Sequence, residues 1–298
     1  MIRKICIVFN PISGKGKSSV QAELLKRELA SAGCTVNLQP SAKSYAEGVL
    51  ESLLNDIELL VIVGGDGTLL PFLSLASDLK VPVYMYPTGN QSLFARHFGM
   101  KRDLSRLILA IKKPKIEPHQ YATLNDHNFF CMASVGLDAE IVKEVSKDRV
   151  APVGNLGYVL PTLRSLLKSK PPTLSIEHDG QLLLEKVKGY LIIANTPQYA
   201  LDLNLLRAAS SQQAKIEAMF LAVSSSAELI LMFAKALVGI DLSKSSKCFR
   251  FSEQSYKVWS EQDNTAVQAD GDFLGELPIE IKRADNPLLV LLPQNFSK

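Results

Sequence analysis

Apolar runs alternate with amphipathic stretches along the first third of the chain. The runs are short and rich in β-branched residues, which is typical of strands buried on both faces. These predicted strands cover residues 5–9, 35–38, 59–63 and 81–86. Leucines at helical spacing predict helices over residues 18–32, 45–54 and 103–111, with another ending near residue 77. Alternating strands and helices predict a parallel sheet with helices on both faces.

The pattern changes after Pro118, where short strands and turn signals replace the long helical stretches. Asn125-Asp126, Asp179-Gly180 and Asp270-Gly271-Asp272 are turn signals between apolar runs. The strands predicted here cover residues 121–124, 129–135, 173–177, 182–186, 187–194, 216–222, 249–252, 256–259, 266–269, 278–282 and 288–292. Helical patches are predicted at residues 139–146 and 158–167. This half therefore reads as an antiparallel β-sandwich.

Two domains follow from this change of pattern. Residues 1–118 are predicted to form a Rossmann-like α/β domain, and residues 119–298 a domain rich in β-sandwich strands. The last strand is expected to be able to pack back on the first domain.

One stretch, residues 61–70, combines a buried strand, a glycine turn and a helix start. Gly64, Gly65 and Gly67 can take φ > 0 and let another group approach the backbone. Free N–H groups at a helix start favour an anion. Asp66 would repel a phosphate unless a cation lay between them, so a nucleotide bound with Mg is the simplest ligand. The alternative is a tight turn in which Asp66 only caps the helix.

Two more loops follow predicted strands, one beginning at Asn10 and one at Pro87. Ligands in parallel sheets bind at the carboxyl ends of strands, where all three loops are expected to lie. The ending Gly16-Lys17-Ser18 is like that of a phosphate-binding P-loop, but the P-loop's first glycine is replaced by Pro11, which excludes that motif.

Composition narrows the class of protein. The net charge of +3 is too small to argue for a nucleic-acid partner. The four cysteines are far apart in sequence and show no paired spacing, which fits small core residues in a reducing compartment. We expect a cytoplasmic protein, since we see neither a signal peptide nor a membrane-spanning run. The four histidines show no metal-ligand spacing.

The stretch 229–238 has two interpretations. Leu229, Ile230, Met232 and Phe233 could contact lipid if this helix lies on a membrane. The alternative is a core helix that covers the sandwich.

Several motifs in order resemble the diacylglycerol kinase catalytic-domain family, which includes sphingosine kinases and bacterial lipid kinases. They are Asn10-Pro11 with Gly14, Gly64-Gly65-Asp66-Gly67-Thr68, Pro87 with Phe94-Ala95-Arg96, Gly136-Leu137-Asp138-Ala139, and Asp270-Gly271. The resemblance covers nearly the whole chain. It implies an α/β nucleotide domain followed by a β-sandwich domain, with the active site between them.

The resemblance also implies roles for individual residues. Phosphates of ATP would be held by Gly64, Gly65, Gly67 and Thr68, with Gly89 and Asn10 also at the nucleotide. Asp66 would hold Mg, directly or through water, and Asp270 would serve the metal–phosphate region. Asp272 stands where the family has a glutamate, the general base for the lipid hydroxyl, and is one methylene shorter.

The chain departs from the family pattern at two places. Asn90, Ser92 and Leu93 replace a threonine, an asparagine and an aspartate of the third loop. In the second domain, Gln212-Gln213-Ala214 replaces an Asp-Asp-Gly segment, and Ala200-Leu201-Asp202 replaces a triple-glycine turn. Neutral amides are weaker ligands than carboxylates for a hard cation, so a metal site built on those carboxylates is not expected.

Three functions are compatible with these motifs. The first is an ATP-dependent lipid kinase that phosphorylates a diacylglycerol-like lipid at a membrane surface, as a monomer or a homodimer, in peripheral contact with the inner face. The second is a regulatory protein of the same fold that binds nucleotide or lipid without turnover. The third is an NAD kinase-like enzyme, although the second domain shows no convincing Asn-Glu motif for the adenosine ribose.

Overall fold

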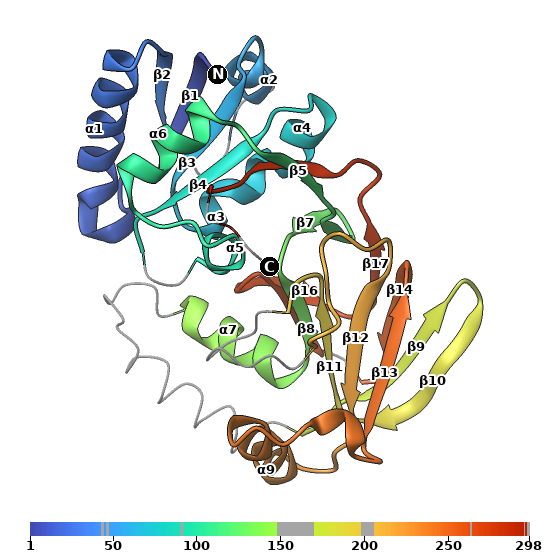
Figure 1. Ribbon diagram of the computed structural model, residues 1–298. Coiled ribbons are helices and arrows are strands. Elements are labelled where there is room, and N and C mark those ends of the chain that lie inside the picture. Colours follow the sequence, from blue (N-terminus) through green and yellow to red (C-terminus); the bar gives the residue numbers. More distant parts are fainter. Residues whose placement is uncertain are drawn as a thin grey trace. The chain divides into compact units, whose positions relative to one another are not determined.

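The computed structural model describes residues 1–42, 45, 48–89, 92–147, 170–197, 206–262, 264–294 and 296 (Figure 1). The helix expected at 158–167, residue Asn90 and the segment 200–202 lie outside these residues. The chain divides into two compact units, one made of Met1–Gln120 with Ala284–Lys298 and the other of Tyr121–Arg283. The boundary in the chain therefore falls between Gln120 and Tyr121, close to the expected Pro118, and the C-terminal segment returns to the first unit.

The first unit contains a six-stranded sheet whose central strands are almost fully buried. Its order is β2 (Thr35–Pro40), β1 (Lys4–Phe9), β3 (Leu59–Gly64), β4 (Val83–Pro87), β18 (Leu288–Leu291) and β5 (Ile116–His119). The first five strands are parallel, and β5 runs antiparallel to β18. Every residue of β3 is buried, as expected for a strand covered on both faces.

Helices cover both faces of this sheet, with α1 and α6 on one side and α2 and α4 on the other (Figure 1). The helical elements are η1 (Ser13–Gly16), α1 (Lys17–Ser31), α2 (Val49–Leu54), α3 (Asp66–Leu69), η2 (Leu70–Phe72), α4 (Leu73–Asp78), α5 (Leu93–His97) and α6 (Leu104–Lys112). Local chemistry sets their ends. Gly33, with φ +87°, follows α1, and the Asp103 carboxylate caps α6 by accepting from Arg106 N at 3.2 Å.

The second unit is a sandwich of two six-stranded sheets with antiparallel strand pairs. One sheet contains β10 (Gln181–Lys188), β9 (Thr173–His178), β14 (Ser255–Ser260), β17 (Ile279–Arg283), β6 (Ala122–Leu124) and β7 (His127–Phe129). The other contains β13 (Cys248–Glu253), β12 (Ile216–Leu221), β11 (Tyr190–Ala194), β8 (Met132–Val135), β15 (Ala266–Ala269) and β16 (Asp272–Glu276). Side chains from both sheets, among them Ile176, Tyr256, Ile193 and Phe220, form one buried core.

The described part of the second unit also contains the helical elements α7 (Leu137–Lys147), α9 (Ser226–Leu237) and η5 (Leu242–Lys244). Helix α7 packs against β15 and β16. The Ser225 hydroxyl caps α9 by accepting from Glu228 N at 3.3 Å.

Two strands that the apolar pattern predicts as continuous are divided in the structure. The run 129–135 becomes β7 and β8, and the run 187–194 is divided at Gly189 between β10 and β11. In both cases the chain passes from one sheet of the sandwich to the other at the break. A Cβ atom on Gly189 would lie 2.2 Å from Leu221 O, so this crossing admits only glycine.

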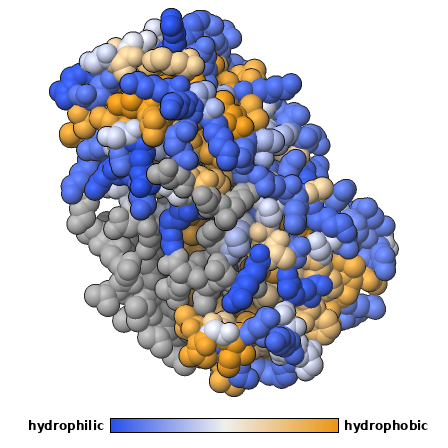
Figure 2. All heavy atoms as spheres, viewed as in Figure 1, coloured by the Kyte–Doolittle hydropathy of each residue, from blue (hydrophilic) through white to orange (hydrophobic). Residues whose placement is uncertain are grey.

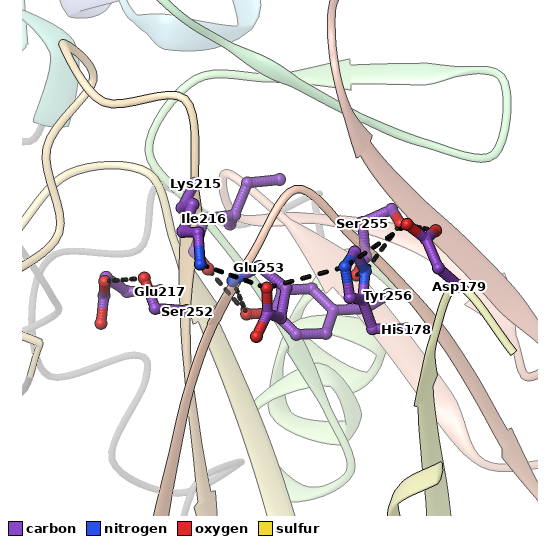
Figure 3. Close-up of polar contacts among 9 residues, drawn as sticks. All are labelled: His178, Asp179, Lys215, Ile216, Glu217, Ser252, Glu253, Ser255 and Tyr256. Atoms are coloured by element: carbon purple, nitrogen blue, oxygen red, sulfur yellow. Dashed lines mark hydrogen bonds and ion pairs between the residues drawn. The ribbon is translucent and has the colours of Figure 1, made fainter. Parts of the chain in front are cut away.

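A cluster of polar side chains joins the β9–β10 hairpin to the β13–β14 hairpin (Figure 3). His178 Nδ1 lies 3.0 Å from Ser255 O, and Lys215 forms an ion pair with Glu253 at 3.4 Å. The buried Tyr256 hydroxyl donates to Ile216 O at 2.7 Å and accepts from Glu253 N at 2.9 Å. Burial raises the pKa of Tyr256, so the hydroxyl remains protonated as a donor. We interpret this cluster as structural.

Replacing Tyr256 with phenylalanine tests that interpretation. The change removes a hydrogen bond to the buried Ile216 carbonyl and one from the partly buried Glu253 N–H, and we expect it to lower the free energy of unfolding by about 1–3 kcal/mol. Calorimetric unfolding of the purified protein measures the loss.

Tyr84 provides the matched control, because it is also fully buried and its hydroxyl has no hydrogen-bond partner among the described residues. Tyr84→Phe is expected to be neutral or stabilising. Equal destabilisation by the two substitutions would contradict a specific role for the Tyr256 hydroxyl.

Candidate functional site

The three loops that follow β1, β3 and β4 are joined by hydrogen bonds at one edge of the first unit's sheet. Asn10 N donates to Val63 O at 3.2 Å, and Thr88 N donates to Gly64 O at 3.1 Å. The hydroxyls of Ser13 and Thr88 lie 2.8 Å apart. The shared edge predicted from the sequence is confirmed. This edge includes the end of β1, which lies between β2 and β3. The strand order reverses direction at β1, and ligands of such sheets bind at the point of reversal.

The glycine turn after β3 depends on space and not on a left-handed backbone. Gly64, Gly65 and Gly67 all have φ outside the left-handed region, so the expected use of φ > 0 is not observed. A Cβ atom on Gly64 would lie 2.5 Å from the hydroxyl oxygen of the buried Thr68. A Cβ atom on Gly65 or Gly67 would meet no atom within 4 Å. Gly64 thus permits Thr68 to pack against the turn, whereas the absence of side chains at Gly65 and Gly67 leaves space beside the backbone for a ligand.

The two flanking loops have complementary features. Gly89, after β4, also has no atom within 4 Å of a built Cβ. Gly14 has φ +59°, and a Cβ atom there would lie 2.9 Å from Thr88 O. The Asn10 side chain accepts from Ile12 N at 3.2 Å, and its carbonyl accepts from the Ser18 hydroxyl. Asn10 therefore shapes its own loop and the start of α1.

Asp66 is the first residue of α3, and its carboxylate is directed at the start of α5. Oδ1 accepts from the Ser92 hydroxyl at 2.6 Å and from Phe94 N at 3.3 Å. Oδ2 accepts from Leu93 N at 2.7 Å. The Ser92 hydroxyl also caps α5 by accepting from Ala95 N at 3.1 Å. The carboxylate thereby joins the glycine turn to the third loop.

Burial raises the pKa of Asp66 above its ordinary value of 3.8, and the hydrogen bonds from Ser92, Leu93 and Phe94 oppose that rise. A carboxylate offers about four acceptor positions, and three are used here. Among the hydrogen bonds of the described residues, one position on Oδ2 is left for water or a cation.

Leu93 replaces an aspartate of the family pattern, yet its backbone has a defined role. Its N–H is a donor to Asp66, and its side chain is half-buried. The substitution removes a carboxylate from this loop and leaves the backbone contact in place.

Asp270 lies in the second unit, and its carboxylate binds backbone groups between β7 and β8. It accepts from Phe130 N at 2.6 Å, Cys131 N at 2.9 Å and Met132 N at 3.0 Å. Its own N–H donates to Met132 O at 2.9 Å, and its φ is +48°, which is uncommon outside glycine and asparagine. Asp270 therefore holds the β15–β16 turn against the crossing between the two sheets.

Asp272 is the first residue of β16, directly after this turn, and its side chain is half-buried. Strand β16 was not predicted from the sequence. It pairs Asp272 with Ala269 of β15, so the carboxylate lies on a regular hairpin strand.

A polar network that the sequence did not reveal supports the same turn. Gln268 Oε1 accepts from Gly271 N at 3.0 Å. Gln268 Nε2 donates to the Ser134 hydroxyl at 2.7 Å and to the Asp138 carboxylate at 3.0 Å, while Ser134 donates to Asp138 at 2.8 Å. Asp138 is in one of the ordered motifs, but no spacing in the sequence connects it to Gln268.

The segment Gln212-Gln213-Ala214 is exposed. It contacts the half-buried last residue of β17, where Arg283 Nε donates to Ala214 O at 3.3 Å. The guanidinium also donates to Lys215 O at 2.5 Å and to the Asn195 side chain. Burial lowers the pKa of Arg283 to about 10. Arg283 thus holds this segment in place by donating to the carbonyl groups of Ala214 and Lys215.

Asp66 belongs to the first unit, whereas Asp270 and Asp272 belong to the second. Within the described ranges, no three His, Cys, Asp or Glu side chains are grouped so as to hold a metal ion.

Comparisons with known proteins cover both units. Residues 4–124 match the diacylglycerol kinase catalytic domain, and residues 131–292 match the YegS C-terminal NAD kinase beta sandwich-like domain. A diacylglycerol kinase of Bacillus subtilis is 22% identical, with 98% of this chain and 97% of the relative aligned. A diacylglycerol kinase of Mycobacterium tuberculosis is 23% identical over 99% of this chain and 96% of the relative.

Solved structures show the same two-domain fold. A putative diacylglycerol kinase from Bacillus anthracis has a TM-score of 0.78 at 17% identity, covering 99% of this chain and 97% of that one. An NAD kinase from Archaeoglobus fulgidus, solved in complex with ATP, has a TM-score of 0.52 at 14% identity, covering 98% of this chain and 94% of that one. The predicted fold, an α/β domain followed by a β-sandwich, is confirmed.

Ser92→Ala tests the link between the glycine turn and α5. Folding raises the pKa of Asp66, so this carboxyl contributes stability that is complete below pH 3.8 and is lost as the pH rises through its folded pKa. Removing the Ser92 hydroxyl removes a bond that lowers this pKa. We expect a further rise, measured by NMR titration of the Asp66 carboxyl carbon, and a loss of about 0.5–2 kcal/mol from the missing helix cap.

Ser92→Thr is the control, because threonine keeps the hydroxyl and is also a good cap. An Asp66 pKa that is the same in Ser92→Ala and in the original protein would show that the hydrogen bond does not form in solution.

Proposed function

Because the chain belongs to the diacylglycerol kinase family of lipid kinases, we propose that it transfers the γ-phosphoryl group of ATP to a hydroxyl of a diacylglycerol-like lipid. Both family matches fall in the order and at the positions of the two structural units. Relatives named diacylglycerol kinase align along almost the whole chain. The sequence motifs and the family therefore favour the same activity.

The observation that carries the proposal is the glycine turn after β3, at residues 64–68, which lies where the strand order of the sheet reverses. A Cβ atom built on Gly65 or Gly67 would meet no atom within 4 Å, and the same holds for Gly89 on the adjacent loop. Phosphate oxygens can approach such backbone closely. Asn10, Gly64 and Thr68 then shape the site by holding the loops together.

Asp66 fits an indirect role toward Mg. With three of its acceptor positions used by Ser92, Leu93 and Phe94, it would hold the ion through water or with the position that the described residues leave open. When bound, Mg neutralises charge that develops on the transferred phosphoryl group. The three donors hold the carboxyl group in one orientation at the start of α5.

We assign the general base to Asp272 and a positioning role to Asp270. In the reaction the lipid hydroxyl oxygen bonds to the γ-phosphorus, the bond from that phosphorus to the bridging oxygen of ADP breaks, and Asp272 accepts the hydroxyl proton. Asp270, Gln268 and Asp138 hold the turn before β16. These contacts fix the position of the Asp272 backbone at the start of β16.

A second candidate is a binding protein of the same fold without turnover. Leu93 motivates it, since this position lacks the family's carboxylate while its backbone contact to Asp66 remains. The glycine turn would then bind nucleotide, but phosphoryl transfer would not occur because the reaction centre lacks a carboxylate. The following variants separate the two functions.

Asp272→Asn is expected to lower turnover at least about 100-fold, because it removes the proton acceptor. The assay follows transfer of labelled phosphate from ATP to diacylglycerol in detergent micelles with Mg present. Asp272→Glu restores the family's residue and is expected to stay within about tenfold of the original, since the carboxylate is retained.

An original protein with no lipid phosphorylation above a blank, yet with measurable ATP binding, would favour the binding protein. Equal turnover in Asp272→Asn and Asp272→Glu would show that Asp272 is not the general base.

Gly65→Ala tests the phosphate turn separately from the fold. Gly65 has φ −124° and room for a methyl group, so the thermal midpoint should be unchanged. We expect ATP affinity, measured by calorimetric titration, to fall at least about tenfold because the added methyl blocks close approach to the backbone.

Gly64→Ala is the contrasting variant, because its Cβ would collide with Thr68 and should destabilise the first unit itself. Unchanged ATP affinity in Gly65→Ala would mean that phosphates bind elsewhere.

A further inference from the structure

Helix α9 and the turn after it expose a continuous series of large apolar side chains. Ile230, Leu231, Leu237, Val238 and Ile240 are between 46% and 76% exposed. Figure 2 shows apolar residues gathered at this end of the second unit. Within the described chain, no helix is both long and apolar enough to cross a membrane. Apolar side chains gathered in this way mark an interaction site more often than chance.

The opposite face of the helix already serves the core. Leu229 and Met232 are buried, so the expectation that these two contact lipid is wrong. Ile230, which belongs to the same predicted set, does lie on the outer face. The helix is thus fixed to the sandwich by one face and presents a second apolar face outward.

Charges around this face favour an anionic partner. From Ser226 to Lys247 the chain has three basic residues (Lys235, Lys244 and Lys247) and two acidic ones (Glu228 and Asp241), which leaves +1. Arg250, on β13, lies beyond this stretch and forms an ion pair with Glu217 at 3.5 Å. Both acidic groups are bound locally. Glu228 accepts from Lys247 and from Ser224 N at 2.8 Å, and Asp241 accepts from Ser243 N at 3.0 Å.

The basic groups Lys235 and Lys244 are exposed beside the apolar side chains. Lys235 is in the last turn of α9, and Lys244 ends η5. Long lysine side chains can extend past apolar neighbours to reach phosphate head groups. An apolar face bordered by lysines is the pattern of a helix that lies in the plane of a membrane interface.

We propose that the outer face of α9, with the Gly239–Ile240 turn, docks the protein on a bilayer of anionic lipid. This inference rests on the proposed lipid kinase function, whose substrate is found in a bilayer. Ile230, Leu231, Leu237 and Val238 enter the boundary between head groups and acyl chains, while Lys235 and Lys244 contact lipid phosphates.

Co-sedimentation with vesicles tests the docking surface. One set of vesicles contains phosphatidylcholine alone, and the other contains phosphatidylcholine with phosphatidylglycerol. The original protein should bind the anionic vesicles, and added salt should weaken the binding. The double variant Leu231→Gln with Val238→Gln should bind at least about tenfold more weakly, since two apolar side chains no longer enter the lipid.

The matched control is the double variant Leu109→Gln with Leu182→Gln. These residues are 43% and 47% exposed and lie on α6 and β10, away from α9 in the chain. The control should bind vesicles like the original protein. Equal loss in both double variants, or no binding of anionic vesicles by the original, would overturn the proposal.

Two further measurements distinguish membrane docking from self-association and from failure of the proposed kinase function. A dimer in analytical ultracentrifugation that the α9 variant converts to monomer, with vesicle binding unchanged, would assign this face to a second copy of the chain and overturn the membrane assignment. Phosphorylation of a short-chain diacylglycerol dispersed without a bilayer should be the same in the α9 variant as in the original. If this activity is absent from both proteins while vesicle binding depends on α9, the proposed function fails and the docking surface stands.

Discussion

A single carboxylate, that of Asp66, controls the geometry of the candidate nucleotide site. Its two oxygens accept one hydroxyl and two backbone N–H groups at the start of α5, so the turn after β3 and the loop after β4 cannot move independently. Gly64 makes this possible, because only glycine lets Thr68 close over the turn. Donors and charges that are held in place before a ligand arrives need no reorganisation when it binds.

The second unit uses a similar arrangement around Asp270. This carboxylate also accepts three backbone N–H groups, here from the crossing between the two sheets of the sandwich. Gln268 and Asp138 support the same turn from the side of α7. Asp66 and Asp270 thus each accept three hydrogen bonds that hold loops together, and Asp272 is the carboxylate proposed as the general base.

Much of the fold could be predicted from periodicity. The parallel strands of the first unit, its helices α1 and α6 and the Asp179-Gly180 hairpin follow from apolar spacing and turn residues, as does the sandwich class of the second unit. Strand β5 (Ile116–His119) was not predicted. The crossings at 130–131 and at Gly189 could not be predicted, because a strand leaving one sheet for the other keeps the same apolar pattern on both sides of the break. Strand β16 was missed because its sequence, DFLGE, contains a glycine and charged ends.

The sequence by itself determined which residues are candidates for chemistry, because the ordered glycine and aspartate motifs identify a nucleotide turn and a family. Tertiary structure decided what each of those side chains does. Asp66 and Ser92 are 26 residues apart in the chain, and Gln268 and Ser134 are 134 apart, yet each pair is within hydrogen-bond distance. The same holds for α9, where two leucines close in sequence have different environments. Leu229 is buried against the sandwich, whereas Leu231 is exposed. Such divisions depend on which neighbours fold against a residue, and spacing along the chain does not contain that information.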